Sequence, residues 1–308
     1  MGGRKVKAVL ADLDSSLTLR IAVALIGLVA CMPAGAQSLL DGSWTAYRHP
    51  TGVFLEHPAS WRTQPTEVGI ALVPGDFDPN SELIIALGES AAGLRGPTDP
   101  QVGQYLDVLV SQVAVAMRRT GQPTSIDFRG GTGALYEYRG VLNTGQPAGA
   151  QFRTAILGGY AVAIAIIATE EKLRQREPIL QRIFASLGHA EPRRDPALVG
   201  TWRATSTESD SSLSGSVFFR TESVYALMPD GRLTTQSRTQ GRVTGAEGGT
   251  AARDTEERSA GSWSAADGRL FILWDDGTST AASYEATGDA VNVRVDGART
   301  PIRLQRVR

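Results

Sequence analysis

Hydrophobic and polar positions divide the chain into two parts with different periodicities. Between about residues 45 and 188, short apolar runs bounded by Pro, Gly and Asp alternate with two stretches of helical periodicity. From residue 197 onward, only short alternating runs occur, separated by turn residues. Short bounded runs are typical of β-strands, and apolar residues repeating every three to four positions are typical of amphipathic helices. We therefore expect an α+β domain followed by an all-β domain.

The first part has the element order strands, helix, strands, helix. Ala161 to Ala168 is continuously apolar rather than alternating, which predicts a central strand covered on both faces. This order, with a sheet buried on two sides, predicts an α/β/α sandwich with an antiparallel sheet. Strands are expected at 53–57, 69–73, 82–87, 124–129, 133–141, 150–158 and 161–168.

Each of the two expected helices has one local signal that sets its limits. Asp99 and Pro100 supply an N-cap and a first-turn proline to a helix that should reach about Arg118, with Met117 on its apolar face. The second helix, about 170–187, carries Pro178, which we expect to break or restart it.

The second part is predicted to be a small β-barrel or sandwich. Turn signals such as Asp267-Gly268 and Asp296-Gly297 recur every 8–12 residues, a spacing typical of an antiparallel meander. Val291, Val293 and Val295 alternate with polar residues, which predicts one buried and one exposed face. Residues 240–256 are rich in Gly and charge, and we expect a long mobile loop there.

The stretch from His189 to Pro196 is polar and carries two prolines, so it is the expected linker. The predicted organisation is therefore a leader at 1–36, an α/β/α domain at 37–188, a linker at 189–196 and a β-barrel domain at 197–308.

The first 36 residues have the pattern of a secretory signal peptide. Four basic residues precede an apolar run at 21–31, and Ala34-Gly35-Ala36 precedes Gln37. This combination of charge, a short apolar region and a small-residue site predicts export with cleavage between Ala36 and Gln37. The apolar run is about half the length that a membrane span needs.

Cys31 offers a second possible fate for this leader. Leu28-Val29-Ala30-Cys31 resembles the lipobox of bacterial lipoproteins, in which the Cys becomes the lipidated first residue. Lipidation at Cys31 would anchor the protein, and it is the one route by which we expect a membrane association. We favour the soluble form, released into the periplasm or the medium.

Two family resemblances accompany these patterns. The run from Gly52 to Pro58 followed by Trp61 resembles the opening of the Mog/PsbP-like fold, and the resemblance extends over about residues 45–188 to the helix ending at Leu187. It implies accessory proteins of photosystem II and bacterial envelope proteins, which act mainly by binding. It implies no metal site here, because no ligand residue can be matched.

The second resemblance, over about residues 197–308, is to the lipocalin/calycin group. Gly200 and Trp202 match the Gly-x-Trp motif of its first strand, and Gly261-Ser262-Trp263 repeats the motif. In that family an Arg of the last strand packs on the Trp ring. This role falls to Arg306, which shares a strand face with Leu304, or to Arg303 if the register differs by one residue.

Composition excludes several functional classes. The chain has 31 Lys+Arg and 32 Asp+Glu, which argues against a nucleic-acid partner. Its single cysteine, Cys31, cannot form an internal disulfide or a cysteine-rich zinc site. No G-x-S-x-G nucleophile motif occurs, and Gly130–Gly133 lacks the Lys of a phosphate loop and is read as a hairpin turn.

Two weaker candidates for a metal site remain, although we expect no metal and no cofactor. His49, Glu56 and His57 could share a metal ion if the two histidines faced one way. The run Asp76 to Glu82 has calcium-like oxygen spacing, but Pro79 favours a hydrophilic turn. His189 is expected to be solvated in the linker.

Together these observations predict a non-catalytic binding or accessory protein of the cell envelope that acts through contacts with an envelope protein. The alternative is a carrier of a small apolar ligand, with the barrel interior lined by Trp202, Trp263 or Trp274. A hydrolase, the third alternative, would require a pocket in which His57 meets carboxylates.

We expect the mature protein to begin at Gln37 and to carry no lipid, because Ala34-Gly35-Ala36 after Pro33 is a small-residue cleavage site of the soluble type. Intact-mass spectrometry of the protein from its native source measures this directly. A lipid-modified N-terminus at Cys31 would establish the anchored form instead.

Overall fold

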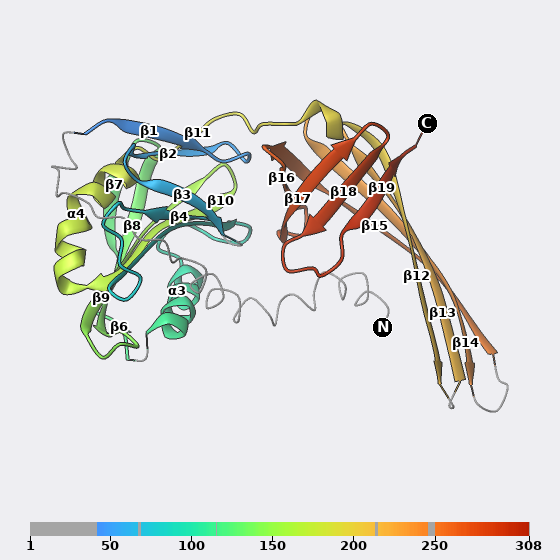
Figure 1. Ribbon diagram of the computed structural model, residues 1–308, viewed down its shortest axis with the longest axis horizontal. Coiled ribbons are helices and arrows are strands. Elements are labelled where there is room, and N and C mark those ends of the chain that lie inside the picture. The colour runs from blue at the N-terminus through green and yellow to red at the C-terminus, as the bar shows by residue number, and fades with distance from the viewer. Residues whose placement is uncertain (1–41, 67–68, 115, 213–214, 246–249, 308) are drawn as a thin grey trace. The chain divides into compact units, whose positions relative to one another are not determined.

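The computed structural model describes residues 42–66, 69–114, 116–212, 215–245 and 250–307. The chain divides into two compact units between Glu191 and Pro192, inside the stretch interpreted as a linker. Most of the described residues lie in strands (Figure 1). Each unit is described by itself below.

The first unit is built on one large antiparallel sheet. Its strand order is β3-β4-β5-β10-β9-β8-β6, with β7 also paired to β8. The apolar run expected to be central forms β10, which pairs with β5 on one side and β9 on the other, as predicted. The strands are β3 (Arg62–Thr66), β4 (Gly69–Val73), β5 (Glu82–Ser90), β6 (Arg118–Arg119), β7 (Thr124–Phe128), β8 (Gly131–Val141), β9 (Pro147–Leu157) and β10 (Tyr160–Thr169).

One helix packs on each face of this sheet. Helix α3 (Pro100–Val113) begins after Asp99, whose side chain accepts a hydrogen bond from the backbone N–H of Gln101, and it buries Leu106 and Val110 against one face. Helix α4 (Glu170–Ala185) buries Leu180 and Phe184 against the other. The sheet is therefore buried on both sides, which explains the absence of alternation in β10.

Two helix predictions were wrong. Pro178 lies inside α4 without interrupting it, because packing of the apolar stripe on the sheet outweighs the loss of one backbone hydrogen bond. Helix α3 ends at Val113 rather than near Arg118, since Ala114 is extended and Arg118 pairs with β8 as part of β6. Met117 consequently lies outside the helix.

A second, small sheet lies over the α4 side of the first unit. It comprises β1 (Trp44–Arg48), β2 (Val53–Pro58) and β11 (Gly188–His189) in the order β1-β2-β11. Leu55 joins the apolar cluster that also contains the buried residues of α4. His189, assigned to the linker from sequence, pairs with Val53 and thus closes this sheet.

A buried ion pair attaches α4 to the large sheet. Arg176 donates two hydrogen bonds of 2.8 Å to the carboxylate of Glu82, whose side chain is fully buried. Arg176 and Lys172 also bond Asp76. Burial alone would raise the pKa of Asp76, but the hydrogen bonds from Arg176 and Lys172 outweigh burial and hold its pKa below the ordinary value.

The second unit is a closed antiparallel barrel of eight strands. Val291 and Val293 are buried while Asn292 and Arg294 are exposed, as the alternation predicted. The described residues of this unit contain one short 3₁₀ turn, Pro196–Leu198, before the first strand. The strands are β12 (Gly200–Ser212), β13 (Gly215–Leu227), β14 (Arg232–Gly245), β15 (Thr250–Ala266), β16 (Arg269–Trp274), β17 (Ser279–Thr287), β18 (Ala290–Val295) and β19 (Ile302–Arg306).

The long loop predicted at 240–256 is a further correction. The described residues of this stretch belong to β14 and β15, which pair from Arg232–Ser262 to Thr244–Thr250. Ion pairs between neighbouring strands, such as Arg238–Asp254, stabilise the pairing of β14 with β15 and explain why a charge-rich segment forms strands. Among the described residues, no helix is long and apolar enough to span a membrane.

Replacing one partner of the Arg176–Glu82 pair should destabilise the first unit strongly. Glu82→Gln removes the buried counter-charge of Arg176 and leaves only the partly exposed Asp76 carboxylate beside the guanidinium, and we expect a loss of about 3–5 kcal/mol in the free energy of unfolding. Urea unfolding followed by circular dichroism measures this loss. The matched control is Arg139→Ala, which removes an exposed pair with Glu170 and should cost about 1 kcal/mol or less. Equal costs for the two variants would contradict the assignment.

Candidate functional site

The residues predicted for export, Cys31, Ala36 and Gln37, lie outside the described residues. The structure therefore bears on the other predicted residues, which are Gly200, Trp202 and Arg306 in the barrel and the histidines and carboxylates of the first unit.

Gly200, Trp202 and Arg306 come together where the first and last barrel strands meet. Trp202 pairs with Arg306 across β12 and β19, and the Arg306 guanidinium carbon lies 4.2 Å from the Trp202 ring centroid. Gly200 has a φ of +141°, and a Cβ there would collide with the Arg306 guanidinium. The glycine thus makes room for the cation on the ring, and Arg303 lies on the exposed face instead.

Both side chains of this contact donate hydrogen bonds to the turn that precedes β12. Arg306 donates hydrogen bonds to the carbonyls of Val199 (2.9 Å) and Ala197 (3.0 Å). The indole N–H of Trp202 donates to the carbonyl of Leu198 at 2.7 Å. One arginine therefore joins the last strand, the first strand and the entry turn.

Large side chains fill the barrel interior. Trp202 and Trp263 are almost fully buried, and Trp263 donates its indole N–H to the carbonyl of Met228. Tyr284 donates a hydrogen bond of 2.6 Å to Asp195, and burial together with this bond raises the pKa of Tyr284 well above its ordinary value. The cluster also includes Leu198, Leu227, Leu233, Leu270, Val291, Val293 and Leu304.

Four strands continue beyond the closed part of the barrel, as Figure 1 shows for β12, β13 and β14. We call this extension the arm and define it as residues 204–212, 215–223, 237–245 and 250–257. Strand β19 pairs with β12 at Trp202 and Arg203, and β16 pairs with β15 from Gly261 to Ala266. The arm is therefore a four-stranded sheet in the order β12-β13-β14-β15.

Among the arm residues whose side chains the structure describes, polar cross-strand contacts lie on both faces of the sheet. On the face that continues the barrel interior, hydroxyl pairs join Ser223 to Ser237 (2.8 Å) and Thr221 to Thr239 (3.0 Å). On the outer face, Arg238 bonds Asp254 through both oxygens. Cross-strand pairs of these kinds stabilise a sheet that has no second layer.

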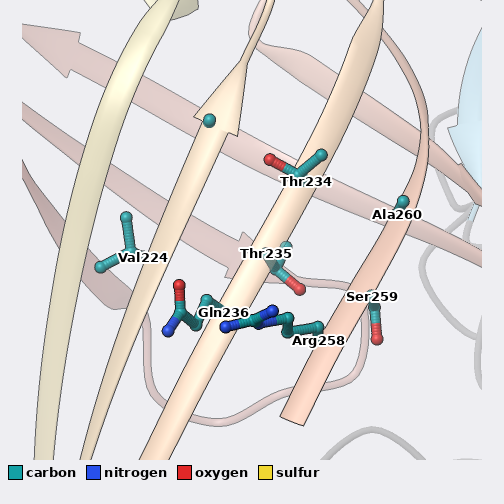
Figure 2. A pocket seen from close by; sticks show the side chains of 8 residues that line it. Val224, Thr234, Thr235, Gln236, Arg258, Ser259 and Ala260 are labelled. Atoms are coloured by element: carbon teal, nitrogen blue, oxygen red, sulfur yellow. The ribbon is translucent and has the colours of Figure 1, made fainter.

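A hollow of about 410 Å³ lies at the base of the arm. Figure 2 shows Val224, Gln236 and Arg258, which lie opposite one another across β13, β14 and β15. Ala226, Thr234 and Ala260 form the adjoining row, and the small size of these residues leaves the hollow. Its lining is mixed apolar and polar, and Thr235 and Ser259 complete it.

The histidines of the first unit do not converge. His49 bonds the hydroxyl of Thr51, whereas His57 is buried with its Nδ1 against the carbonyl of Pro58. Glu56 and His57 are neighbours in β2 and so point to opposite faces. Exposed His189 contacts the carbonyl of Thr51. In the part of the chain that the structure describes, no cluster of His, Cys, Asp or Glu could hold a metal ion.

The acidic run from Asp76 to Glu82 forms a turn. Asp78 accepts hydrogen bonds from the backbone and side chain of Asn80, and this hydrogen bond from the Asn80 backbone lowers the pKa of Asp78. Asp76 and Glu82 are occupied by Arg176. The carboxylates of Asp76 and Glu82 therefore belong to the ion-pair cluster that attaches α4 to the sheet.

Sequence reasoning missed the arm, which is the most distinctive feature of the second unit. A signal was present, because hydroxyl residues at 235, 237 and 239 alternate with Gln or Arg at 236, 238 and 240, as expected for a strand, and acidic residues follow at 254, 256 and 257. The glycine content of 240–256 concealed it. Gly241 in fact lies beneath the Phe219 ring, where a Cβ would clash with that ring.

Comparison with known proteins does not show a family for this chain. No protein-family model and no curated protein matches the chain. One similar solved structure is the cyanobacterial PsbP protein CyanoP from Synechocystis sp. PCC 6803, at 14% identity and a TM-score of 0.38, covering 53% of this chain and 99% of that one. Another is a tail fiber of Staphylococcus aureus phage P68, at 8% identity and a TM-score of 0.15, covering 85% of this chain and 73% of that one.

Arg306→Ala should destabilise the barrel by about 2–3 kcal/mol, because it removes a cation–π contact and two charged hydrogen bonds to carbonyls. The matched control is Arg303→Ala on the exposed face of the same strand, for which we expect a change below about 0.5 kcal/mol. Thermal unfolding monitored by near-ultraviolet circular dichroism compares the two variants. An Arg306 variant as stable as the wild type would show that the contact does not hold the closure.

Proposed function

We propose that this protein is an exported, non-catalytic binding or accessory protein of the cell envelope that acts through protein–protein contacts. The arm of the barrel domain is the docking element. The observation that carries the proposal is the combination of a filled barrel interior with a four-stranded sheet that extends beyond the closed strands.

The arm has the properties of a contact surface. It exposes Phe218, of which 50% is accessible, on the outer face, next to the exposed Arg242 opposite it on β14. Aromatic and arginine side chains are enriched in protein interfaces. The hollow lined by Val224, Gln236 and Arg258 gives the same face a site of the size that receives a partner side chain.

The family assignments belong to the same proposal. A helix on each face of the sheet supports a Mog/PsbP-like α/β/α domain. The Gly200–Trp202–Arg306 contact supports a lipocalin-like barrel. Export is supported by the leader pattern of residues 1–36. A shared fold does not establish function, so the arm and not the family carries the functional argument.

A small-ligand carrier is the weaker candidate. It requires space inside the barrel, whereas Tyr225, Leu227 and Leu270 belong to the interior cluster together with Trp202 and Trp263. An eight-stranded barrel has an interior that side chains can just fill, and these side chains occupy it.

Shortening the arm tests the proposal without opening the barrel. Residues 206–221 and 239–255 are each replaced by Asn-Gly, which joins the opposed pairs Thr205–Glu222 and Arg238–Glu256 by two-residue turns. We expect this variant to remain folded but to lose the envelope protein that crosslinks to and co-purifies with the wild type. Native mass spectrometry from the native source detects that partner.

The control is Arg294→Ala with Arg303→Ala, on exposed positions of β18 and β19 away from the arm, which should retain the partner. Retention of the partner by the shortened variant would exclude the arm as the docking element. A small molecule bound equally to the wild type and the shortened variant would support the carrier instead.

A further inference from the structure

The first strand of the arm has an open edge. Beyond Arg203, which pairs with Gln305 of β19, the described residues of β12 pair with β13 alone. This leaves nine residues, Ala204 to Ser212, with one side of the strand available for a further strand. Such an edge is a template for pairing unless it is protected.

The direction of the backbone groups on this edge follows from one hydrogen bond. The backbone N–H of Val307, the residue that follows β19, donates to the carbonyl of Thr201 at 2.8 Å. Backbone groups alternate in direction along a strand, so those of Thr205 and Thr207 also point outward. Those of Ala204 and Ser206 point to β13.

The two open edges of the arm differ in protection. On β15, the carbonyl of Ala260 accepts from Asp275, which places Asp254, Glu256 and Arg258 at the outward positions. Charged side chains on an edge strand discourage pairing. The equivalent described positions on β12 are Thr205 and Thr207, which are exposed, uncharged and β-branched, and therefore suited to a sheet.

We propose that a second copy of this chain pairs with β12, antiparallel, about a two-fold axis through Thr207. Thr207 then faces Thr207 of the other copy as a doubly hydrogen-bonded pair, and Thr205 faces residue 209. The two arms become one continuous eight-stranded sheet. A two-fold axis makes one edge complementary to itself, so no second type of surface is required.

The geometry of the edge favours this occupant and limits the ladder. Residue 203 is already paired with β19, so a partner strand can extend from 204 to 210 and then must diverge. In this register Glu208 stands opposite Ser206 and Asp210 opposite Ala204, so no charged residue stands directly opposite a like charge. Antiparallel pairing directs the two barrels to opposite ends of the joint sheet. An interface of one short ladder is small, and we expect a dimer that forms only at micromolar or higher concentration.

Introducing a charge at residue 207, which lies on the proposed axis, tests both the partner and the register. Thr207→Lys and Thr207→Glu should each be monomeric, because the axis brings two like charges directly opposite one another. An equimolar mixture should dimerise again. Sedimentation velocity of the full mature chain over about 1–500 μM measures the dissociation constant. We expect each single variant to weaken dimerisation at least tenfold and the mixture to restore it.

Proline variants give an independent comparison of the two edges. Thr207→Pro removes an outward N–H without breaking the β12–β13 ladder and should also weaken dimerisation at least tenfold. Glu256→Pro makes the equivalent change on β15 and should leave dimerisation unchanged, and far-ultraviolet circular dichroism checks that both variants fold.

A wild-type chain that stays monomeric throughout this range overturns the proposal, as does a Lys/Glu mixture that stays monomeric or a Glu256→Pro variant that is weakened equally. Retention of a different envelope protein by a monomeric chain would leave the proposed function intact and overturn only this inference.

Discussion

The second unit depends on how its first strand meets its last. Closure runs through two residue pairs, Trp202–Arg306 and Arg203–Gln305, and the Arg306 guanidinium on the Trp202 ring lies at that junction. Arg306 also binds the entry turn through Val199. A barrel removes its own sheet edges only where it closes, so this short junction decides where edges disappear and where they remain.

Strand length explains why the arm exists. Strands β12 to β15 have 13 to 17 residues, whereas β16 to β19 have 5 to 9. The short strands can close the barrel over part of that length, and the apolar interior is confined to that part. Beyond it the long strands have no opposite wall, and Ser223–Ser237 and Arg238–Asp254 take over from apolar packing.

Much of this architecture could be predicted where local chemistry determines structure. Asp99 caps α3 as expected, and the Gly200–Trp202–Arg306 contact followed from a motif and strand alternation. Pro178 misled because its local cost is smaller than the packing of α4. The Arg176–Glu82 pair joins positions 94 residues apart, and nothing local marks either residue. The arm was missed because glycines that fit beneath aromatic rings look the same in sequence as glycines that form loops.

The polar construction of the arm has a consequence for its dynamics. Its strands are continuous with the barrel, yet along β12 and β13 the apolar cluster reaches the arm only at Ala204 and otherwise ends at Trp202 and Tyr225. Local opening of a segment costs little when few apolar contacts are lost. We therefore expect amide hydrogens of the arm to exchange with solvent through sub-global openings, while those of the barrel exchange through global unfolding. Any contact that orders the arm would slow this exchange and extend the cooperative unit of the barrel outward along the same four strands.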